Sequence, residues 1–181
     1  DPRLAKYAAP VVSATGDTSK IDYVQYGGNT YAGMPYGILT PGILQTRISF
    51  LPSAVIYDGT NAGGMIFSYA QVCFSYAEAH LRGWTGLAGD AQTWYELGIA
   101  ASHGQWGVAS ADAAAYLASV APVSMETMAT EKWVALYMQG YESWSEWRRL
   151  DYPVLATAKD ALTGTGIPVR YGYGARTASA N

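Results

Sequence analysis

Two glutamates have the spacing in this chain that comes nearest to catalytic chemistry. Glu142 and Glu146 are four residues apart, so a helix would place them on one face. A pair of carboxylates can hydrolyse a glycosidic bond, but only when both groups flank the substrate in a cleft. Arg148 and Arg149 follow directly, and we expect ion pairing instead, with Glu142 paired to Arg149 or to a partner elsewhere in the fold.

The other reactive side chains are scattered along the chain. His80 and His103 each lie alone near the end of a predicted helix, where a cation interacts favourably with the helix dipole. Asp17, Asp22 and Asp58 lack the alternating spacing of a calcium loop. No Gly-x-Ser-x-Gly, His-Glu-x-x-His or P-loop spacing occurs. We therefore expect no enzyme, no bound metal and no cofactor.

Composition excludes several further classes of protein. The 181 residues carry 11 Lys+Arg against 14 Asp+Glu, which disfavours a nucleic-acid-binding protein. Half of the residues are hydrophobic, which excludes disorder, but no run of eighteen apolar residues predicts a membrane-spanning helix.

Cys73 is the only cysteine, so we expect no internal disulfide and interpret it as a small buried hydrophobe. The first residue is Asp1 rather than methionine, which favours an internal start.

Helical periodicity dominates the middle of the chain. It predicts four helices, at about residues 65–82, 88–104, 110–120 and 124–150. Ser110 is the expected N-cap of the third. The first two carry small residues at their expected contact, among them Ala77 and Gly98, and resemble one helix pair of a tetratricopeptide repeat. One such pair cannot bury its own apolar face, so other helices must cover that face.

The fourth predicted helix carries a stripe of tryptophans. Trp133, Gly140, Trp144 and Trp147 recur at steps of three, four or seven residues. Helical spacing of this kind favours core packing over ligand stacking. We therefore expect Trp144 to be mostly buried.

Tyrosines in the first part of the chain are better candidates for a ligand site. Residues 1–64 are rich in glycine and proline, and short runs at 21–26 and 47–51 could form strands. Four tyrosines lie there between glycines: Tyr23, Tyr26, Tyr31 and Tyr36. A tyrosine ring can stack on a sugar ring or clamp a peptide. The alternative is that these rings attach the loops to the helices.

Several stretches together resemble a known family. They are residues 69–79, Arg82-Gly83-Trp84, residues 94–102 and residues 130–149 followed by Tyr152-Pro153. Asp1-Pro2-Arg3-Leu4 and Ile167-Pro168-Val169-Arg170 fit as well. In this order they resemble the C-terminal part of the SusD-like (SusD/RagB) outer-membrane lipoproteins.

This resemblance implies a function that the residues alone do not. Members of the family are mostly α-helical, lie at the outer-membrane surface and bind oligosaccharides, or peptides in some branches. They act without catalysis as the lid of a TonB-dependent SusC-like transporter. Their lipidated N-terminal cysteine would precede Asp1 here.

The sequence thus predicts a mainly α fold, with a tetratricopeptide-like helical scaffold and long loop-rich segments. We expect a loop-rich segment with short strands at 1–64, an α-helical body at 65–150 and an irregular tail at 151–181, all within the C-terminal region of a larger protein. Two other functions stay open: a tetratricopeptide-type module that binds only a protein, and, less favoured, a glycan-cleaving enzyme. Sequence does not choose between glycan and peptide.

Overall fold

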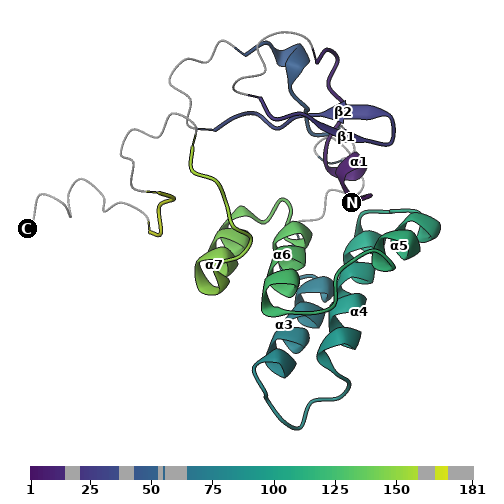
Figure 1. The fold of residues 1–181 in the computed structure, drawn as a ribbon, viewed down its shortest axis with the longest axis vertical. Helices are drawn as coiled ribbons and strands as arrows, with labels where there is room; N and C mark the ends of the chain where they lie inside the picture. Colours follow the sequence, from purple (N-terminus) through teal and green to yellow (C-terminus); the bar gives the residue numbers. More distant parts are fainter. Residues whose placement is uncertain (15–20, 37–42, 53–54, 56–64, 159–165, 171–181) are drawn as a thin grey trace, which may run out of the picture.

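A computed structural model describes residues 1–14, 21–36, 43–52, 55, 65–158 and 166–170. This part of the chain is mainly α-helical, as predicted (Figure 1). Its elements are α1 (Leu4–Tyr7), β1 (Val24–Tyr26), β2 (Asn29–Tyr31), the 3-10 helix η1 (Gln45–Arg47), α3 (Tyr69–Leu81), α4 (Ala91–Gln105), α5 (Ser110–Leu117), α6 (Met125–Ala135) and α7 (Gly140–Leu150). None of the helices described combines the length and apolar composition that a membrane span requires.

Side-chain caps define where the main helices begin. The Ser68 hydroxyl accepts a hydrogen bond from the Gln71 amide, and the Gln71 side chain caps the Ser68 amide in return, so α3 starts at Tyr69 rather than at residue 65. The Asp90 carboxylate accepts from the Thr93 amide at 2.8 Å and starts α4. Ser110 is not a cap, because Ala109 occupies the N-cap position of α5.

The predicted single helix over 124–150 is wrong, because it is divided into α6 and α7. Met138 has a φ of 70°, in the left-handed region, and the helix cannot continue through it. The apolar periodicity runs on across the break, with Leu136 buried at 1% exposure, so the pattern contains no sign of the interruption.

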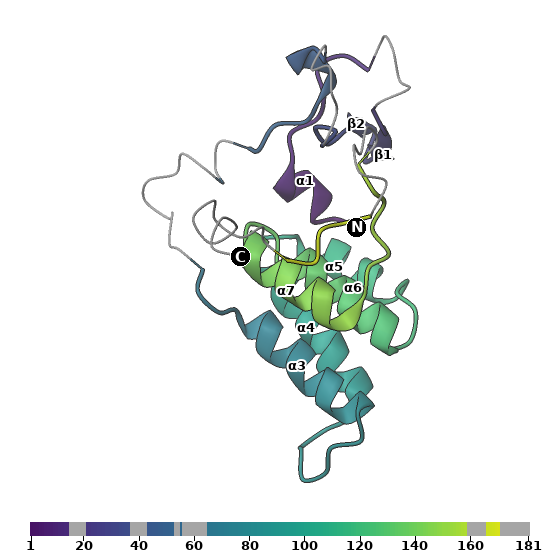
Figure 2. The same ribbon diagram turned by 90° about the vertical axis from the view of Figure 1, so that its left-hand side faces the viewer.

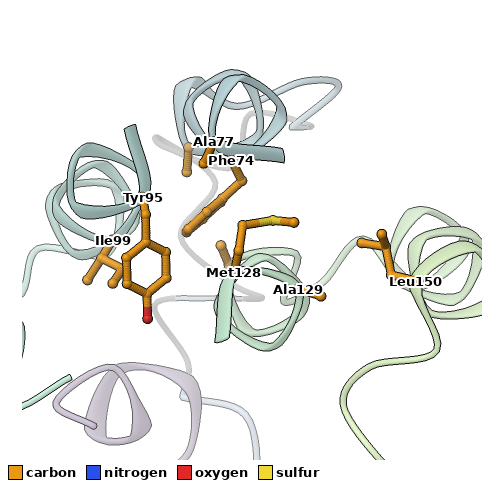
Figure 3. Packing of buried hydrophobic residues seen from close by; sticks show 9 residues of the cluster. Phe74, Ala77, Tyr95, Ile99, Met128, Ala129 and Leu150 are labelled. Carbon is orange, nitrogen blue, oxygen red and sulfur yellow. The ribbon is translucent and has the colours of Figure 1, made fainter. Parts of the chain in front are cut away.

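Buried side chains from four helices form the core (Figure 3). Phe74 of α3 and Tyr95 of α4 lie 6.4 Å apart between ring centroids, and Met128 of α6 packs with them. Ala77 and Gly98 are both buried, as the predicted helix contact requires. Leu150 extends the cluster to α7.

The first part of the chain forms a small irregular layer at the other end of the molecule from the α3–α4 connection (Figure 2). Its centre is the antiparallel hairpin β1–β2, with Val24 opposite Tyr31. Backbone hydrogen bonds attach neighbouring segments: the Val11 amide donates to the Thr30 carbonyl at 2.9 Å, and the Ser49 amide donates to the Ala32 carbonyl at 2.7 Å. A strand forms within 21–26 as predicted, whereas none forms over 47–51.

The tryptophan stripe packs less completely than the sequence predicts. Trp144 is half-buried, its indole N–H donates to the Pro168 carbonyl at 3.2 Å, and the Arg148 guanidinium lies 4.8 Å from the ring centroid. Trp144 is therefore largely but not completely buried, and it does not belong to the core cluster. The break before Gly140 is the physical reason, because α7 does not continue the inward face of α6.

Candidate ligand-binding pocket

The four predicted tyrosines lie in different environments. Tyr31 is buried at 4% exposure, whereas Tyr36 is 61% exposed and its hydroxyl donates to the Ala156 carbonyl. Tyr23 is half-buried, and its buried hydroxyl has no hydrogen-bond partner among the described residues. Tyr26, at the end of β1, is half-buried and lines a pocket. The hairpin thus brings one of the four to the edge of a cavity, and their joint role as a ligand site stays a prediction.

This pocket encloses about 620 Å³ between the hairpin and the helical body. One side comes from α1 and β1, and the other from the end of α6, the α6–α7 turn and the start of α7. Its lining is mainly aliphatic and aromatic: Leu4, Tyr7, Val24, Tyr26, Trp133, Val134, Leu136, Tyr137 and Met138, with Asp1, Arg3, Gln25, Gly140 and Ser143 completing it. This size and composition are typical of small-ligand sites.

Two tyrosines of the pocket lining, Tyr7 and Tyr137, belong to a cluster of aromatic rings. Tyr7 and Tyr137 stack with ring centroids 4.0 Å apart, and Trp106 packs edge-on against both. The Tyr137 hydroxyl donates to the Tyr7 carbonyl at 2.6 Å, and the Tyr7 hydroxyl donates to the Val134 carbonyl at 3.2 Å. Burial raises the pKa of Tyr7 to about 12, so this hydroxyl stays protonated. These hydroxyls hold α1 on α6.

A buried arginine, Arg3, lies on the same side of the pocket as Tyr7. Arg3 is 0% exposed, and its guanidinium donates to the carboxylates of Asp1 and Glu131 and to the hydroxyl of Ser102. His103 lies beside them: its Nδ1 is 2.8 Å from the Ile99 carbonyl, and its Nε2 is 3.8 Å from the Asp1 carboxylate. Burial lowers the pKa of His103, so the ring is neutral in the folded protein. His103 is therefore part of the core.

One of the two glutamates of α7, Glu146, takes part in ion pairs, as the sequence predicts. Glu146 pairs with Lys132 at 2.8 Å and with Arg149 at 2.6 Å. Arg149 also pairs with Glu78 of α3, and the expected ion pair of Glu142, with Arg149 or with a partner elsewhere in the fold, is not found among the described residues. Within the part of the chain that is described, no three His, Cys, Asp or Glu side chains converge on a possible metal site.

Sequence reasoning missed most of the pocket. Tyr7 belongs to no motif, and the 130–149 stretch of the family resemblance gives no role to Tyr137 or Met138. Trp133, predicted to be core, is half-buried and lines the cavity. Tyr26 is the residue that both the sequence and the geometry indicate. The signal that could have found Arg3 is the Asp1-Pro2-Arg3-Leu4 stretch of the family resemblance, which gives no role for the arginine.

Comparisons with known proteins agree with this fold. The chain matches over residues 1–174 the family model SusD-like_2, described as starch-binding and associating with the outer membrane. Among solved structures, a chitin-binding protein is 26% identical with a TM-score of 0.74, covering 99% of this chain and 41% of that one. A SusD homologue from Bacteroides vulgatus is 23% identical with a TM-score of 0.71, covering 93% and 38%.

A third structure, a SusD-like protein from Bacteroidetes, is 33% identical with a TM-score of 0.57, over 65% of this chain and 26% of that one. No curated protein gives a significant match. The chain thus spans about two fifths or less of the length of these three structures. Because the family match covers nearly all of its residues, the chain belongs to the SusD-like family, as the sequence resemblance implies.

Proposed function

We propose that this protein binds oligosaccharide nutrients at the outer-membrane surface and delivers them, without catalysis, to a TonB-dependent SusC-like transporter. The observation that carries the proposal is the family match over residues 1–174, because the description of that family names both starch binding and the outer membrane. The relative at 26% identity is titled a chitin-binding protein, which is a second glycan. An N-terminal lipid anchor outside these residues would attach the protein to the membrane.

The pocket beside the hairpin is the proposed ligand site. Its aromatic rings can stack on the apolar faces of sugars, and the proposed tyrosines Tyr23, Tyr26, Tyr31 and Tyr36 all lie in the segment next to it. Tyr26 is the first residue to test, because it lines the cavity. Tyr31 is buried, so its proposed contribution is to hold the hairpin in place.

Isothermal titration calorimetry tests the binding proposal. Malto-oligosaccharides, chito-oligosaccharides and a mixture of peptides are titrated separately into the protein, and each incubated sample is then analysed for cleavage products. We expect one glycan class to bind without cleavage and Tyr26→Ala to weaken binding by about 1–3 kcal/mol. Binding of peptides alone would favour the peptide branch of the family, and product release would favour an enzyme.

Co-purification tests the transporter proposal. The longer protein is extracted from outer membranes in mild detergent, and we expect a TonB-dependent transporter to accompany it in equal amount. Recovery of the protein without any transporter would contradict delivery while leaving glycan binding intact.

A further inference from the structure

Arg3 connects three segments that are far apart in the sequence. Its Nη2 donates to Glu131 of α6 at 2.5 Å, and its Nη1 donates to Ser102 of α4 at 3.0 Å. Its Nε and Nη2 also donate to the Asp1 carboxylate at 2.7–3.1 Å. A fully buried guanidinium is tolerated only when such partners compensate for its lost hydration.

Glu131 is shared between Arg3 and another element. Its second carboxylate oxygen accepts a hydrogen bond from the Tyr116 hydroxyl at 2.6 Å, so one side chain of α6 links the first segment to α5 as well. The Arg3 guanidinium also lies 5.7 Å from the centroid of the Tyr116 ring. Removing the guanidinium would leave Glu131 and Asp1 without their buried counter-ion.

The segment that begins at Arg3 also forms one side of the pocket, called here the α1–β1 wall. Arg3 directly precedes α1, and Leu4 and Tyr7 of α1 line the pocket. Four residues after α1, the Val11 amide donates to the carbonyl of Thr30 on β2, the partner strand of β1. Residues 24–26 of β1 form the neighbouring part of the lining. The position of α1 on the helical body therefore fixes the position of the β1–β2 hairpin relative to α6 and α7.

We propose that Arg3 is a positioning residue for the pocket, fixing the wall made by α1 and β1 against the wall made by α6 and α7. Its effect on ligand affinity rests on the proposed function, whereas its effect on the hairpin does not. Tyr7 supplies a second attachment through its stacking on Tyr137 and its hydroxyl bond to Val134. Loss of Arg3 therefore loosens the wall without detaching it.

Hydrogen exchange of the full chain, followed by mass spectrometry, tests this proposal. In Arg3→Met, we expect amides over 24–31 to exchange roughly 10–100-fold faster, as the loss of charge-assisted hydrogen bonds implies, while α3 and α4 keep their protection. Arg3→Lys retains the positive charge but lacks the planar guanidinium that donates to several partners at once. We expect its amides over 24–31 to exchange more slowly than those of Arg3→Met but faster than those of the wild type. Arg149→Met is the matched control, because it removes an ion-paired arginine from α7, and it leaves residues 24–31 unchanged.

The affinity of the same variants for the glycan that the wild type binds is the second readout. We expect Arg3→Met to weaken it roughly tenfold or more and Arg149→Met to leave it unchanged. Unchanged exchange over 24–31 in Arg3→Met would overturn the proposal, even if the protein melted earlier. If Arg3→Met does not fold, Ser102→Ala replaces it, because it removes the hydrogen bond between Arg3 and Ser102. Its hydrogen exchange over 24–31 and its glycan affinity are then expected to change in the same directions. A wild type that binds no glycan would instead contradict the proposed function, and the exchange result would still decide the role of Arg3.

Discussion

Gly98 of α4 lies directly against the ring of Phe74 of α3. A Cβ at position 98 would approach three ring carbons at 2.8–2.9 Å, closer than nonbonded carbon atoms can stand. Both residues are buried, and the ring packs with Ile99 and Met128 of the same core. The two helices approach this closely because position 98 carries no side chain.

Adding a methyl group at this contact should destabilise the fold. We expect Gly98→Ala to lower the free energy of unfolding by about 1–3 kcal/mol, because Phe74 must move within a packed core. Gly104→Ala is the control: it lies in the same helix with open space around it, and should stabilise the protein by about 0.5–1 kcal/mol. Urea denaturation of both variants measures the difference. Equal effects would show that α3 and α4 are not in close contact.

The Glu78 carboxylate makes the stability of the helical body depend on pH. Burial opposes its ionisation, but hydrogen bonds from Arg149 and Arg82 outweigh burial and lower the pKa of Glu78 to about 2. A lowered carboxyl pKa stabilises the fold above the unfolded value of 4.5, and this stabilisation is lost as pH falls toward 2. The loss amounts to roughly 3 kcal/mol.

Thermal melting between pH 2 and pH 6 tests this expectation. Glu78→Gln should melt at a lower temperature at pH 6 and show a flatter dependence on pH than the wild type. Glu142→Gln, an exposed residue of α7, is the control and should follow the wild-type curve. Parallel curves for wild type and Glu78→Gln would refute the role of this ion pair.

Trp144 should contribute less to stability than its place on the tryptophan stripe implies. It is half-buried and contacts Arg148 and Pro168, whereas Phe74 is fully buried. We expect Trp144→Ala to cost about 1–2 kcal/mol and Phe74→Ala about 3–5 kcal/mol, measured by urea denaturation. A cost for Trp144→Ala as large as that for Phe74→Ala would mean that α7 buries this face in solution.

The hairpin tyrosines should separate into a structural residue and a surface residue. Tyr31→Ala removes a buried ring and should lower the free energy of unfolding by about 3 kcal/mol. Tyr36→Ala loses mainly the hydrogen bond to Ala156 and should cost about 1 kcal/mol. Differential scanning calorimetry of the two variants compares them. The reverse order would place Tyr31 at the surface and favour it as a ligand contact.

The sequence predicted those parts of the fold that depend on local pattern. Periodicity identifies α3 and α4 to within a few residues, and the small residues Ala77 and Gly98 are buried, as a close contact between these helices requires. The break at Met138 was not predictable, because a left-handed backbone angle at a methionine leaves no compositional trace. Part of the predicted site, Tyr26, does line a cavity.

The rest of the pocket lay beyond sequence reasoning for a physical reason. Its walls meet only through tertiary contacts, such as the stacking of Tyr7 on Tyr137, residues separated by 130 positions. No local pattern marks either ring as the partner of the other. The pairing of Arg3 with Glu131 is hidden in the same way.

The distance along the chain between Arg3 and Glu131 also has a consequence for the order in which the protein matures. The two residues are 128 positions apart, so at ribosomal rates of about 5–20 residues per second Glu131 is made roughly 6–26 s after Arg3. Until then the guanidinium can pair with the Asp1 carboxylate but not with that of Glu131, so it must remain partly hydrated. The segment that carries Arg3 therefore cannot reach its final position before α6 has been synthesised, and the wall of the pocket closes only when the helices that follow this segment have been completed.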